Sequence, residues 1–375
     1  MTFDDAKKMW EKDMLSFGLT HANNQKKILT DWKGGKPNPD FNPVYYDGAR
    51  VFYQIYDYTK DAKWLDAAKV SVQLYRDTYL LPNQGRLPGY WIFPQGLAED
   101  FRRTGDTFSK DSVMLLSNNS SYATDLDSVG HGSYLVSANG SRECAYAIMA
   151  HLVAESLGKV REKKTLDRIR NLYGHFDQWF ISKTWVPQPF MVGLACEALM
   201  MWEVVSNDDK VFPAIKLAGE GLMETHWRES NQSFVYADPP TNMTLTTGAP
   251  DLNLLILPIY GYLAKRTGDI KYQQWGDKIF IGGRVAWIAG NKQFNQNYRN
   301  SFNYVRDRMP APIDYFVYKA PTPGEITRNT AVQKAASSLV TILWASCPDN
   351  AQRSLAIQKL EECVLYAGES ISKLE

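Results

Sequence analysis

The chain has 375 residues, of which 44% are hydrophobic and 22% are charged, so it is long enough to bury a sizeable core in one or more domains. Its formal net charge of +1 at pH 7 gives no global field for a nucleic-acid polymer or a membrane surface, and we expect neither as a partner. No run of 18 apolar residues occurs, and the N-terminus lacks a signal-peptide core, which predicts synthesis in the cytoplasm.

The cysteines and the known motifs argue against a metal or a cofactor. Four cysteines lie in apolar segments with helical character: Cys144, Cys196, Cys347 and Cys363. None has the spacing of a zinc site or of a CxxC motif, so we expect buried thiols in a reducing compartment. The sequence also contains no Walker loop, no GxSxG elbow and no HExxH motif. We therefore expect no cofactor and no metal.

Taken in chain order, five stretches repeat one plan of a polar or aromatic head, an apolar helix, a short turn and a second, amphipathic helix. They occupy residues 43–80, 88–119, 141–180, 187–227 and 250–290. Their turns recur as YTKD, RTGD, VSND and RTGD, in which Gly or Asn suits a left-handed helix C-cap and Asp suits the next N-cap. A sixth head begins near residue 292 without a second helix, and the helix expected at residues 3–19 supplies its partner.

The two helices of each repeat differ in polarity. The first is apolar nearly all round, as in LNLLILPIYGYLA (252–264), which predicts burial on every side. The second carries many charges, as in REKKTLDRIRNLYGHFDQW (161–179), which predicts one solvent-facing side. Six inner helices enclosed by six outer helices form an all-α (α/α)6 toroid, which we expect over residues 1–308.

The third inner helix begins with an ion pair. Arg142 and Glu143 follow Ser141, the expected N-cap, and an arginine there opposes the positive end of the helix dipole. In a toroid the inner helices are parallel, so their polar heads, which in the sixth repeat include Arg299, converge on one face around an axial pocket. The pair would then form the wall of this pocket. The expected substrate-binding residues at these heads are Tyr45, Arg50, Tyr90, Trp91, Arg142, Tyr146, Gln188, Asn253 and Gln296.

Two kinds of sugar chemistry fit these heads. Glycoside hydrolysis needs two carboxylates across the scissile bond, for which Glu143 and Asp251 are the leading candidates and Asp47 is the third. Lyase chemistry needs a base such as Tyr45 or His131, and a cation or amide, such as Arg142 or Asn253, to neutralise a uronate. The alternative is that hydrogen-bonded polar groups only fill the centre of the ring, with Asp47 and Asp251 acting as helix caps.

A long loop precedes the third inner helix. Residues 117–140 exceed the usual length of a connecting loop and contain Asp125, Asp127, His131 and Tyr134. One interpretation is a lid that brings a general acid or base over the pocket, and the other is a surface loop without a role. The aromatic content, 11 Trp, 21 Tyr and 16 Phe, is also open to two interpretations, a carbohydrate cleft or a large helical core.

The predicted architecture resembles the (α/α)6 toroids of glycoside hydrolases, polysaccharide lyases and sugar epimerases. The resemblance covers about residues 1–308 and consists of the architecture and the RTGD turns, without a diagnostic catalytic motif. It implies a polysaccharide or oligosaccharide as substrate. A shared fold gives only a prior on function, and no family's catalytic residues map onto these positions.

The C-terminal part has a different character. Four prolines between residues 310 and 323 predict a linker over 309–326, and helices on both sides of CPDNAQ predict a helical hairpin over 327–375. A two-helix hairpin is too small to be stable alone, so we expect it to oligomerise or to dock on a partner. Arg353 at the start of the second helix is interpreted either as an exposed residue or as a phosphate contact.

This hairpin resembles the hairpin domain of phage-encoded anti-CBASS and anti-Thoeris sponge proteins over about residues 328–375. The matching residues are Pro348, Arg353, Ser354, Leu355, Ala356, Leu360, Glu361, Glu362 and Ala367. In those sponges the hairpin oligomerises, and cyclic nucleotides bind between protomers. The resemblance implies a phage source, a homo-oligomer or a phage-particle partner through 327–375, and, more weakly, nucleotide binding.

Together these features predict a phage-derived, carbohydrate-active toroid, a virion-associated hydrolase or lyase that acts on host surface glycan. It would be made in the host cytoplasm and then carried in the virion. Two alternatives remain at this point. One is a non-enzymatic structural or decoration protein that assembles through its C-terminal hairpin, and the other is a cyclic-nucleotide sponge with a toroid attached.

Overall fold

The computed structural model describes two compact units. The first combines Met1–Ile259 with Gly276–Val305, and the second combines Tyr260–Trp275 with Arg306–Glu375. The described residues are 1–34, 42–122, 136–236, 248–284, 291–308 and 323–346, together with the single positions 353, 356, 357, 359, 360, 363 and 364. Within them the chain is mostly helical and has one small sheet, which confirms the all-α class.

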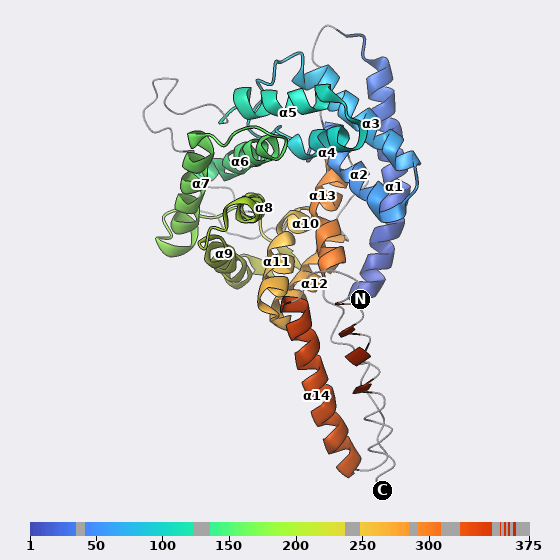
Figure 1. The fold of residues 1–375 in the computed structure, drawn as a ribbon, viewed down its shortest axis with the longest axis vertical. Helices are drawn as coiled ribbons and strands as arrows, with labels where there is room; N and C mark the ends of the chain where they lie inside the picture. The colour runs from blue at the N-terminus through green and yellow to red at the C-terminus, as the bar shows by residue number, and fades with distance from the viewer. Residues whose placement is uncertain are drawn as a thin grey trace. The chain divides into compact units, whose positions relative to one another are not determined.

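The helices follow one another with few other elements between them (Figure 1). They are α1 (Phe3–Asp31), α2 (Gly48–Thr59), α3 (Lys63–Tyr75), α4 (Pro94–Thr104), α5 (Thr107–Asn119), α6 (Ser141–Ser156), α7 (Lys163–Phe176), α8 (Pro189–Ser206), α9 (Val211–Thr225), α10 (Asn253–Ile256), α11 (Pro258–Thr267), α12 (Ile270–Arg284), α13 (Asn291–Asp307) and α14 (Pro323–Ser346). The sheet pairs β1 (Trp227–Arg228) with β2 (Ser233–Phe234) in antiparallel register, Trp227 opposite Phe234.

The predicted turns recur with the same hydrogen bonds at four places. In each turn a Thr or Ser hydroxyl donates to the carbonyl four residues earlier, and its oxygen accepts from the N–H of an Asp two residues later. The Asp carboxylate then accepts from the N–H two residues further on, at the start of the next helix. The residue between hydroxyl and Asp is left-handed, with φ of 60° at Lys60, 75° at Gly105, 53° at Asn207 and 68° at Gly268. The left-handed C-caps are confirmed, and Asp106 is the N-cap of α5 as predicted, whereas the N-caps of α3 and α9 are Ala62 and Lys210 and not the preceding Asp.

Burial separates the two helices of a repeat most clearly at α6 and α8. Every residue of α6 from Glu143 to Ala154 is buried, as is every residue of α8 from Pro189 to Leu199. The following helix α7 alternates buried and exposed residues, as an amphipathic helix does. By length and composition α8 is also the one helix in the described part of the chain that could cross a membrane, but 67% of it is buried inside the first unit, as in the core helix of a folded domain.

Neighbouring helices of the first unit pack in a regular order. Helix α2 lies between α3 and α4, and α6 lies beside α8, as Figure 1 shows. Further contacts join α4 to α6 and α8 to α10. Helix α1 packs on α3 and also on α13, where the Trp10 indole donates to the Ser301 hydroxyl over 3.1 Å and the Tyr298 hydroxyl donates to the Trp10 carbonyl over 2.8 Å. The expected partner of the sixth head is therefore in contact with it.

Two local expectations about helix ends were wrong. Helix α1 does not end near residue 19 but continues to Asp31. Gly18 lies inside the helix, where a Cβ would be 3.0 Å from the Phe294 ring and 3.1 Å from the Trp64 ring, so close packing and not a helix end accounts for this glycine. The N-cap of α6 is Gly140, and Ser141 is the first helical residue. Its buried hydroxyl makes no capping hydrogen bond, since a short 3₁₀ turn, Ala138–Gly140, leads directly into the helix.

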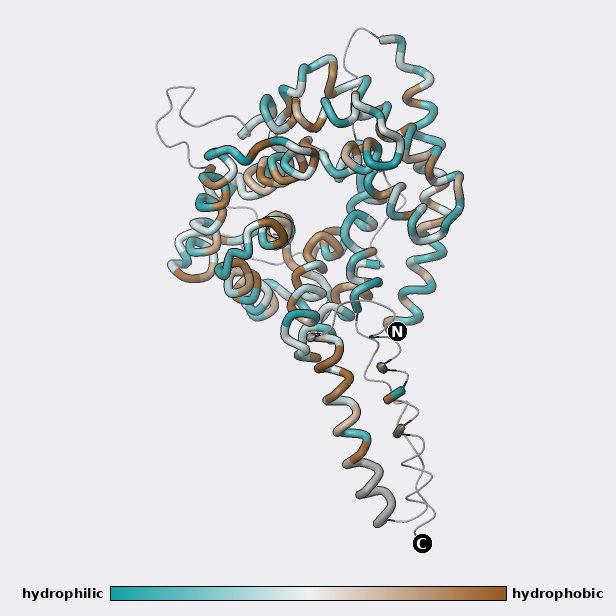
Figure 2. Tube along the Cα trace, viewed as in Figure 1, coloured by the Kyte–Doolittle hydropathy of each residue, from teal (hydrophilic) through white to brown (hydrophobic). Residues whose placement is uncertain are grey.

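The second unit contains α14 and the segment around Gly268. A Cβ on Gly268 would lie 2.9 Å from Thr341 Cγ2, so this turn packs closely on α14. Helix α14 begins at Pro323, inside the predicted linker, because proline suits the first position of a helix. Hydrophobic residues recur along α14 (Figure 2), and Leu339 and Ile342 are 44% and 57% exposed. The predicted boundary at 308 and the hairpin over 327–375 stay predictions.

The cysteine expectation is partly confirmed. Cys144 and Cys196 are free and buried, whereas Cys363 is free but exposed, so the expected burial of all four thiols was wrong at that position. Cys347 lies outside the described residues. Burial raises the pKa of the Cys144 thiol to about 12, which makes it an inert core residue at neutral pH.

Candidate functional site

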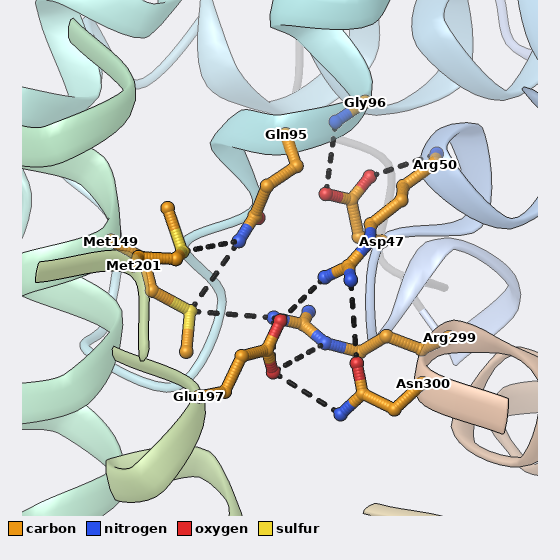
Figure 3. A network of polar contacts seen from close by, with 9 residues as sticks. All are labelled: Asp47, Arg50, Gln95, Gly96, Met149, Glu197, Met201, Arg299 and Asn300. Atoms are coloured by element: carbon orange, nitrogen blue, oxygen red, sulfur yellow. Dashed lines mark hydrogen bonds and ion pairs between the residues drawn. The ribbon is translucent and has the colours of Figure 1, made fainter. Parts of the chain in front are cut away.

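A buried ion-pair cluster joins three helices of the first unit (Figure 3). Glu197 of α8 accepts from Arg50 Nη1 of α2 at 2.6 Å and from Arg299 Nη2 of α13 at 3.2 Å. Asn300 Nδ2 donates to the same carboxylate at 3.2 Å, and Arg50 Nη2 donates to Asn300 Oδ1 at 3.4 Å. The cluster is mostly buried, since Glu197 is 7% exposed and Arg299 is 0% exposed, while the Arg50 side chain is 13% exposed.

Charge pairing keeps this cluster ionised. Burial alone would raise the pKa of Glu197, but the charges of Arg299 and Arg50 outweigh burial and lower it to about 2. Burial likewise opposes the charge of Arg299, but Glu197 outweighs it and raises the pKa of the guanidinium. Glu197 is therefore a fixed anion at neutral pH and cannot serve as a general acid.

Asp47 holds two helix starts. Its Oδ1 accepts from the Arg50 N–H at 3.1 Å as the N-cap of α2, and its Oδ2 accepts from the Gly96 N–H at 3.0 Å in the first turn of α4. Burial raises the pKa of this carboxyl. Because both oxygens are held by backbone groups, the contacts favour capping over catalysis for this residue.

The backbone before α2 is strained. Tyr46 and Asp47 both have positive φ angles, 64° and 67°, a region that non-glycine residues avoid. Such outliers concentrate at functional sites, where the surrounding structure holds them in place. Here the turn keeps Tyr46 and Tyr45 buried, with the Tyr45 ring 5.6 Å from that of Phe93, just before α4.

The predicted ion pair at the head of α6 lies among aromatic rings. Arg142 Nε donates to Glu143 Oε1 at 3.0 Å, and Arg142 Nη2 donates to the same oxygen. The guanidinium lies 5.3 Å from the centre of the Tyr90 ring, which is 37% exposed. Burial opposes the charge of Arg142, but Glu143 outweighs it and raises the pKa of the guanidinium. We name this group, Tyr90 with Arg142 and Glu143, the head cluster.

One face of α6 connects the head cluster to the ion-pair cluster. Glu143, Tyr146 and Met149 follow one another at helical spacing of three residues, so they share that face. Met149 Sδ lies 3.4 Å from both Gln95 Nε2 and Arg299 Nη2 (Figure 3). The Arg299 guanidinium lies 5.5 Å from the centre of the Tyr146 ring. Four side chains from α4, α6 and α13, those of Gln95, Tyr146, Met149 and Arg299, thus meet in the interior.

Four buried polar atoms in this region have no hydrogen-bond partner. They are Gln95 Oε1, Glu143 Oε2, Tyr146 Oη and Arg299 Nη1. An unpartnered buried polar atom costs about 1–3 kcal/mol, so each of the four needs an explanation, such as an ordered water or a bound polar ligand. The face of α6 and the side chains opposite it, Gln95, Glu143, Tyr146, Met149 and Arg299, are named the interior site.

Asp251 and Gln296 are hydrogen-bonded to each other, whereas the Asn253 side chain forms hydrogen bonds with backbone groups. Gln296 Nε2 donates to the Asp251 carbonyl and, at 3.2 Å, to its Oδ2. Asp251 itself lies in a 3₁₀ turn before α10 and stays partly exposed. Asn253 donates to the Gln232 and Ile279 carbonyls and accepts from the Phe234 N–H. Its contacts favour a structural role in anchoring β2.

The remaining predicted residues differ in how far the structure describes them. Trp91 lies beside Tyr90, with ring centroids 5.3 Å apart, and Gln188 is a buried residue at the start of α8 whose Oε1 has no partner. His131 lies outside the described residues, as do Asp125, Asp127 and Tyr134, so the predicted lid stays a prediction. Within the described ranges no group of His, Cys, Asp and Glu is arranged to hold a metal.

The sequence reasoning missed Glu197, Asn300 and Met149. One signal was present for Glu197, because it is the only acid in the apolar run FMVGLACEALMM (190–201), and a lone carboxylate on a buried helix needs a charged partner. The pairing itself connects positions 147 and 102 residues apart, which no local pattern encodes.

Arg353 in the second unit is not exposed, so that interpretation was wrong. It is 4% exposed, and its guanidinium lies 4.1 Å from the centre of the Trp344 ring of α14. The cation–π contact explains its burial.

Comparison with known proteins gives no relative for this chain. No family model, no curated protein and no solved structure matches it. The functional argument therefore rests on the geometry described above.

Proposed function

We propose that residues 1–308 form an (α/α)6 toroid whose helix heads surround an axial ligand site. The order of contacts supports this, since α2, α4, α6, α8 and α10 pack in sequence. Helix α13 then joins both ends of the series, through Gln296 to Asp251 before α10 and through Arg299 and Asn300 to the cluster with Arg50 of α2. The three matching turns within the first unit, at Lys60, Gly105 and Asn207, support the repeat that such a ring requires.

The proposed activity is cleavage of a polysaccharide or oligosaccharide at the head cluster, with Glu143 as the acid or base. The observation that carries it is the state of the Glu143 carboxylate. Oε1 is held by Arg142, whereas Oε2 is buried without a partner and so is the oxygen available for proton exchange with a substrate. The half-exposed Tyr90 ring beside it offers an apolar face for stacking on a sugar.

Asp251 is the proposed second carboxylate of a hydrolase, and Gln296 positions it by two hydrogen bonds. In the lyase alternative Arg142 neutralises a uronate, and a tyrosine such as Tyr45 takes the proton. Burial raises the pKa of Tyr45 to about 12, which disfavours it as a base at neutral pH. Hydrolysis is therefore the form of the proposal that we prefer.

The test is an assay of the full chain on a panel of bacterial capsular and exopolysaccharides, with and without Glu143→Gln. New reducing ends without the ultraviolet absorbance of unsaturated uronates indicate hydrolysis, and both signals together indicate a lyase. Glu143→Gln should abolish the turnover per folded molecule, and because it leaves the largely buried Arg142 without its counter-charge it should also lower the unfolding midpoint. The control is Glu220→Gln, which removes a surface partner of Lys216 and should keep full activity. Equal turnover of the wild-type chain and the Glu143→Gln variant would refute the role of Glu143.

A non-enzymatic role is favoured by one observation, the exposed Leu339 and Ile342 of α14. Such side chains suit assembly of a phage structural or decoration protein through the second unit. Sedimentation of the full chain tests this role, since Leu339→Ser and Ile342→Ser should dissociate the assembly that the wild type forms.

A sponge role would instead require that cyclic nucleotides bind the full chain and that Arg353→Ala lowers the affinity of the chain for them.

A further inference from the structure

The interior site carries a more specific inference, which rests on the proposed function. We infer that its ligand is an acidic sugar whose carboxylate accepts hydrogen bonds from the Tyr146 hydroxyl and from Arg299 Nη1, while its hydroxyls donate to Glu143 Oε2 and Gln95 Oε1.

The two unpartnered donors lie together. Tyr146 and Arg299 are both 0% exposed, and the guanidinium lies 5.5 Å from the centre of the phenol ring. Bulk water therefore does not reach these two donors, and a partner for them would have to be a molecule held inside the fold. Burial raises the pKa of the Tyr146 hydroxyl, so it keeps its proton and acts as a donor at neutral pH. Two adjacent donors are best satisfied by a group with two acceptor oxygens.

A carboxylate is a better partner for the Tyr146 hydroxyl and Arg299 Nη1 than a sugar hydroxyl or a phosphate. A sugar hydroxyl offers one oxygen and no charge, whereas hydrogen bonds from a guanidinium to a carboxylate are charge-assisted and about twice as strong. A phosphate would bring up to two negative charges into a region where three guanidinium groups, those of Arg50, Arg142 and Arg299, already share the carboxylates of Glu143 and Glu197. A single negative charge is the better electrostatic match.

The two unpartnered acceptors define the rest of the ligand. Glu143 precedes Tyr146 by three residues on α6, and Gln95 contacts Met149, three residues after Tyr146. Acceptors of this kind are satisfied by hydroxyl donors, and a molecule that carries both a carboxylate and several hydroxyls is a sugar acid. The donors indicate a carboxylate and the acceptors indicate hydroxyl groups, so both sets are needed to identify a sugar acid as the ligand class.

The exposed fractions indicate the side from which such a ligand approaches. Tyr90 is 37% exposed, and the side chains of Arg142 and Glu143 are 21% and 12% exposed, whereas Tyr146 and Arg299 are fully buried. The head cluster is therefore the solvent-facing side and the Tyr146–Arg299 pair the inner end.

The test uses the full chain and matched ligands in isothermal titration. Each acidic capsular oligosaccharide of the panel is paired with its carboxyl-reduced form, which keeps every linkage and hydroxyl but replaces the carboxylate by a primary alcohol. The probe variant is Tyr146→Phe, which removes only the unpartnered hydroxyl and so should fold normally. The control is Tyr173→Phe, which removes a hydroxyl bonded to Asp208 outside the interior site.

The inference predicts that at least one acidic oligosaccharide binds at least about tenfold more tightly than its carboxyl-reduced form, and that Tyr146→Phe removes this preference while Tyr173→Phe keeps it. Equal binding of both forms, or a preference that survives Tyr146→Phe, would overturn the carboxylate assignment but leave glycan binding intact. Binding of inorganic sulfate or acetate that equals binding of the acidic sugar would show an anion site without sugar recognition. If neither form of any oligosaccharide binds, the proposed function fails and this inference fails with it.

Discussion

Arg50 Nη1 and Glu197 Oε1 lie 2.6 Å apart, although 147 positions separate the two residues in the chain. The bond ties the first turn of α2 to the middle of α8, and Arg299 of α13 shares the same carboxylate. One buried anion thus connects three helices that are remote in sequence. It also explains why a carboxylate is tolerated on a helix whose other inner residues are apolar.

The first prediction concerns the removal of that anion. Glu197→Gln leaves Arg50 and Arg299 without their counter-charge in a buried place, so we expect a loss of about 3–5 kcal/mol in the free energy of unfolding. Urea unfolding followed by circular dichroism measures it. Glu220→Gln removes one partner of a partly exposed pair and should cost less than about 1 kcal/mol. Equal losses in the two variants would mean that the buried cluster adds nothing to stability.

The second prediction concerns acid. The pKa of Glu197 is lowered from 4.5 to about 2, so its contribution to stability is complete above pH 4.5 and is lost as the pH falls from 4.5 to 2. Burial lowers the pKa of His21 from 6.5 to about 4, so the unfolded chain binds the extra proton first and stability falls as the pH falls from 6.5 to 4.

Urea midpoints measured from pH 8 to pH 2 should therefore fall in two steps. His21→Gln should flatten the step between pH 6.5 and 4, and Glu197→Gln should flatten the lower step. Burial also lowers the pKa of His226 to about 4, so part of the upper step should persist in the His21 variant. A midpoint that stays constant down to pH 4 would contradict the burial of both histidines in the neutral form.

The sequence predicted those features whose interacting residues lie close together in the chain. The hydroxyl, the left-handed residue and the Asp of each turn lie within a few positions of one another, so the turns and their helices were predictable. The Arg142–Glu143 pair was predictable for the same reason, because its partners are adjacent. The toroid closure and the catalytic roles stay predictions.

The interior site was only partly predictable, because its composition depends on tertiary contacts. Tyr146 was expected at the site, but the approach of Arg299 to its ring joins residues that lie far apart in the chain. Asp47 shows the reverse case. Its sequence position suited either a catalytic carboxylate or a cap, and only the hydrogen bond from Gly96, 49 residues away, distinguishes them.

The third prediction uses two of the recurring turns. Lys60 has a φ of 60°, which costs a non-glycine residue about 1 kcal/mol, so Lys60→Gly should stabilise the chain by about that amount. Gly105 has a φ of 75°, and no atom lies within 4 Å of the position that a Cβ would take there, so Gly105→Ala should destabilise the chain through the backbone alone, again by about 1 kcal/mol. Thermal unfolding should show a higher midpoint for Lys60→Gly and a lower midpoint for Gly105→Ala. The same sign for both would show that the left-handed conformation does not decide the outcome.

The last prediction separates capping from catalysis at Asp47. The Asp47 carboxylate accepts hydrogen bonds from the backbone N–H groups of Arg50 and Gly96. Asparagine keeps only one acceptor oxygen, so one of these two N–H groups would face its NH₂ group and lose its hydrogen bond. We expect Asp47→Asn to lower the free energy of unfolding by about 1–3 kcal/mol and to keep the turnover per folded molecule on any polysaccharide that the wild type cleaves.

Asp251→Asn is the matched variant, because Asp251 is partly exposed and its backbone carbonyl as well as its carboxylate accepts from Gln296. It should change stability little and abolish turnover if Asp251 is the second carboxylate. The two variants should therefore show opposite effects in unfolding and activity assays. A stable Asp47→Asn variant without turnover, beside an active Asp251→Asn variant, would move the catalytic assignment to Asp47, since a cap alone cannot lower the rate of a correctly folded enzyme.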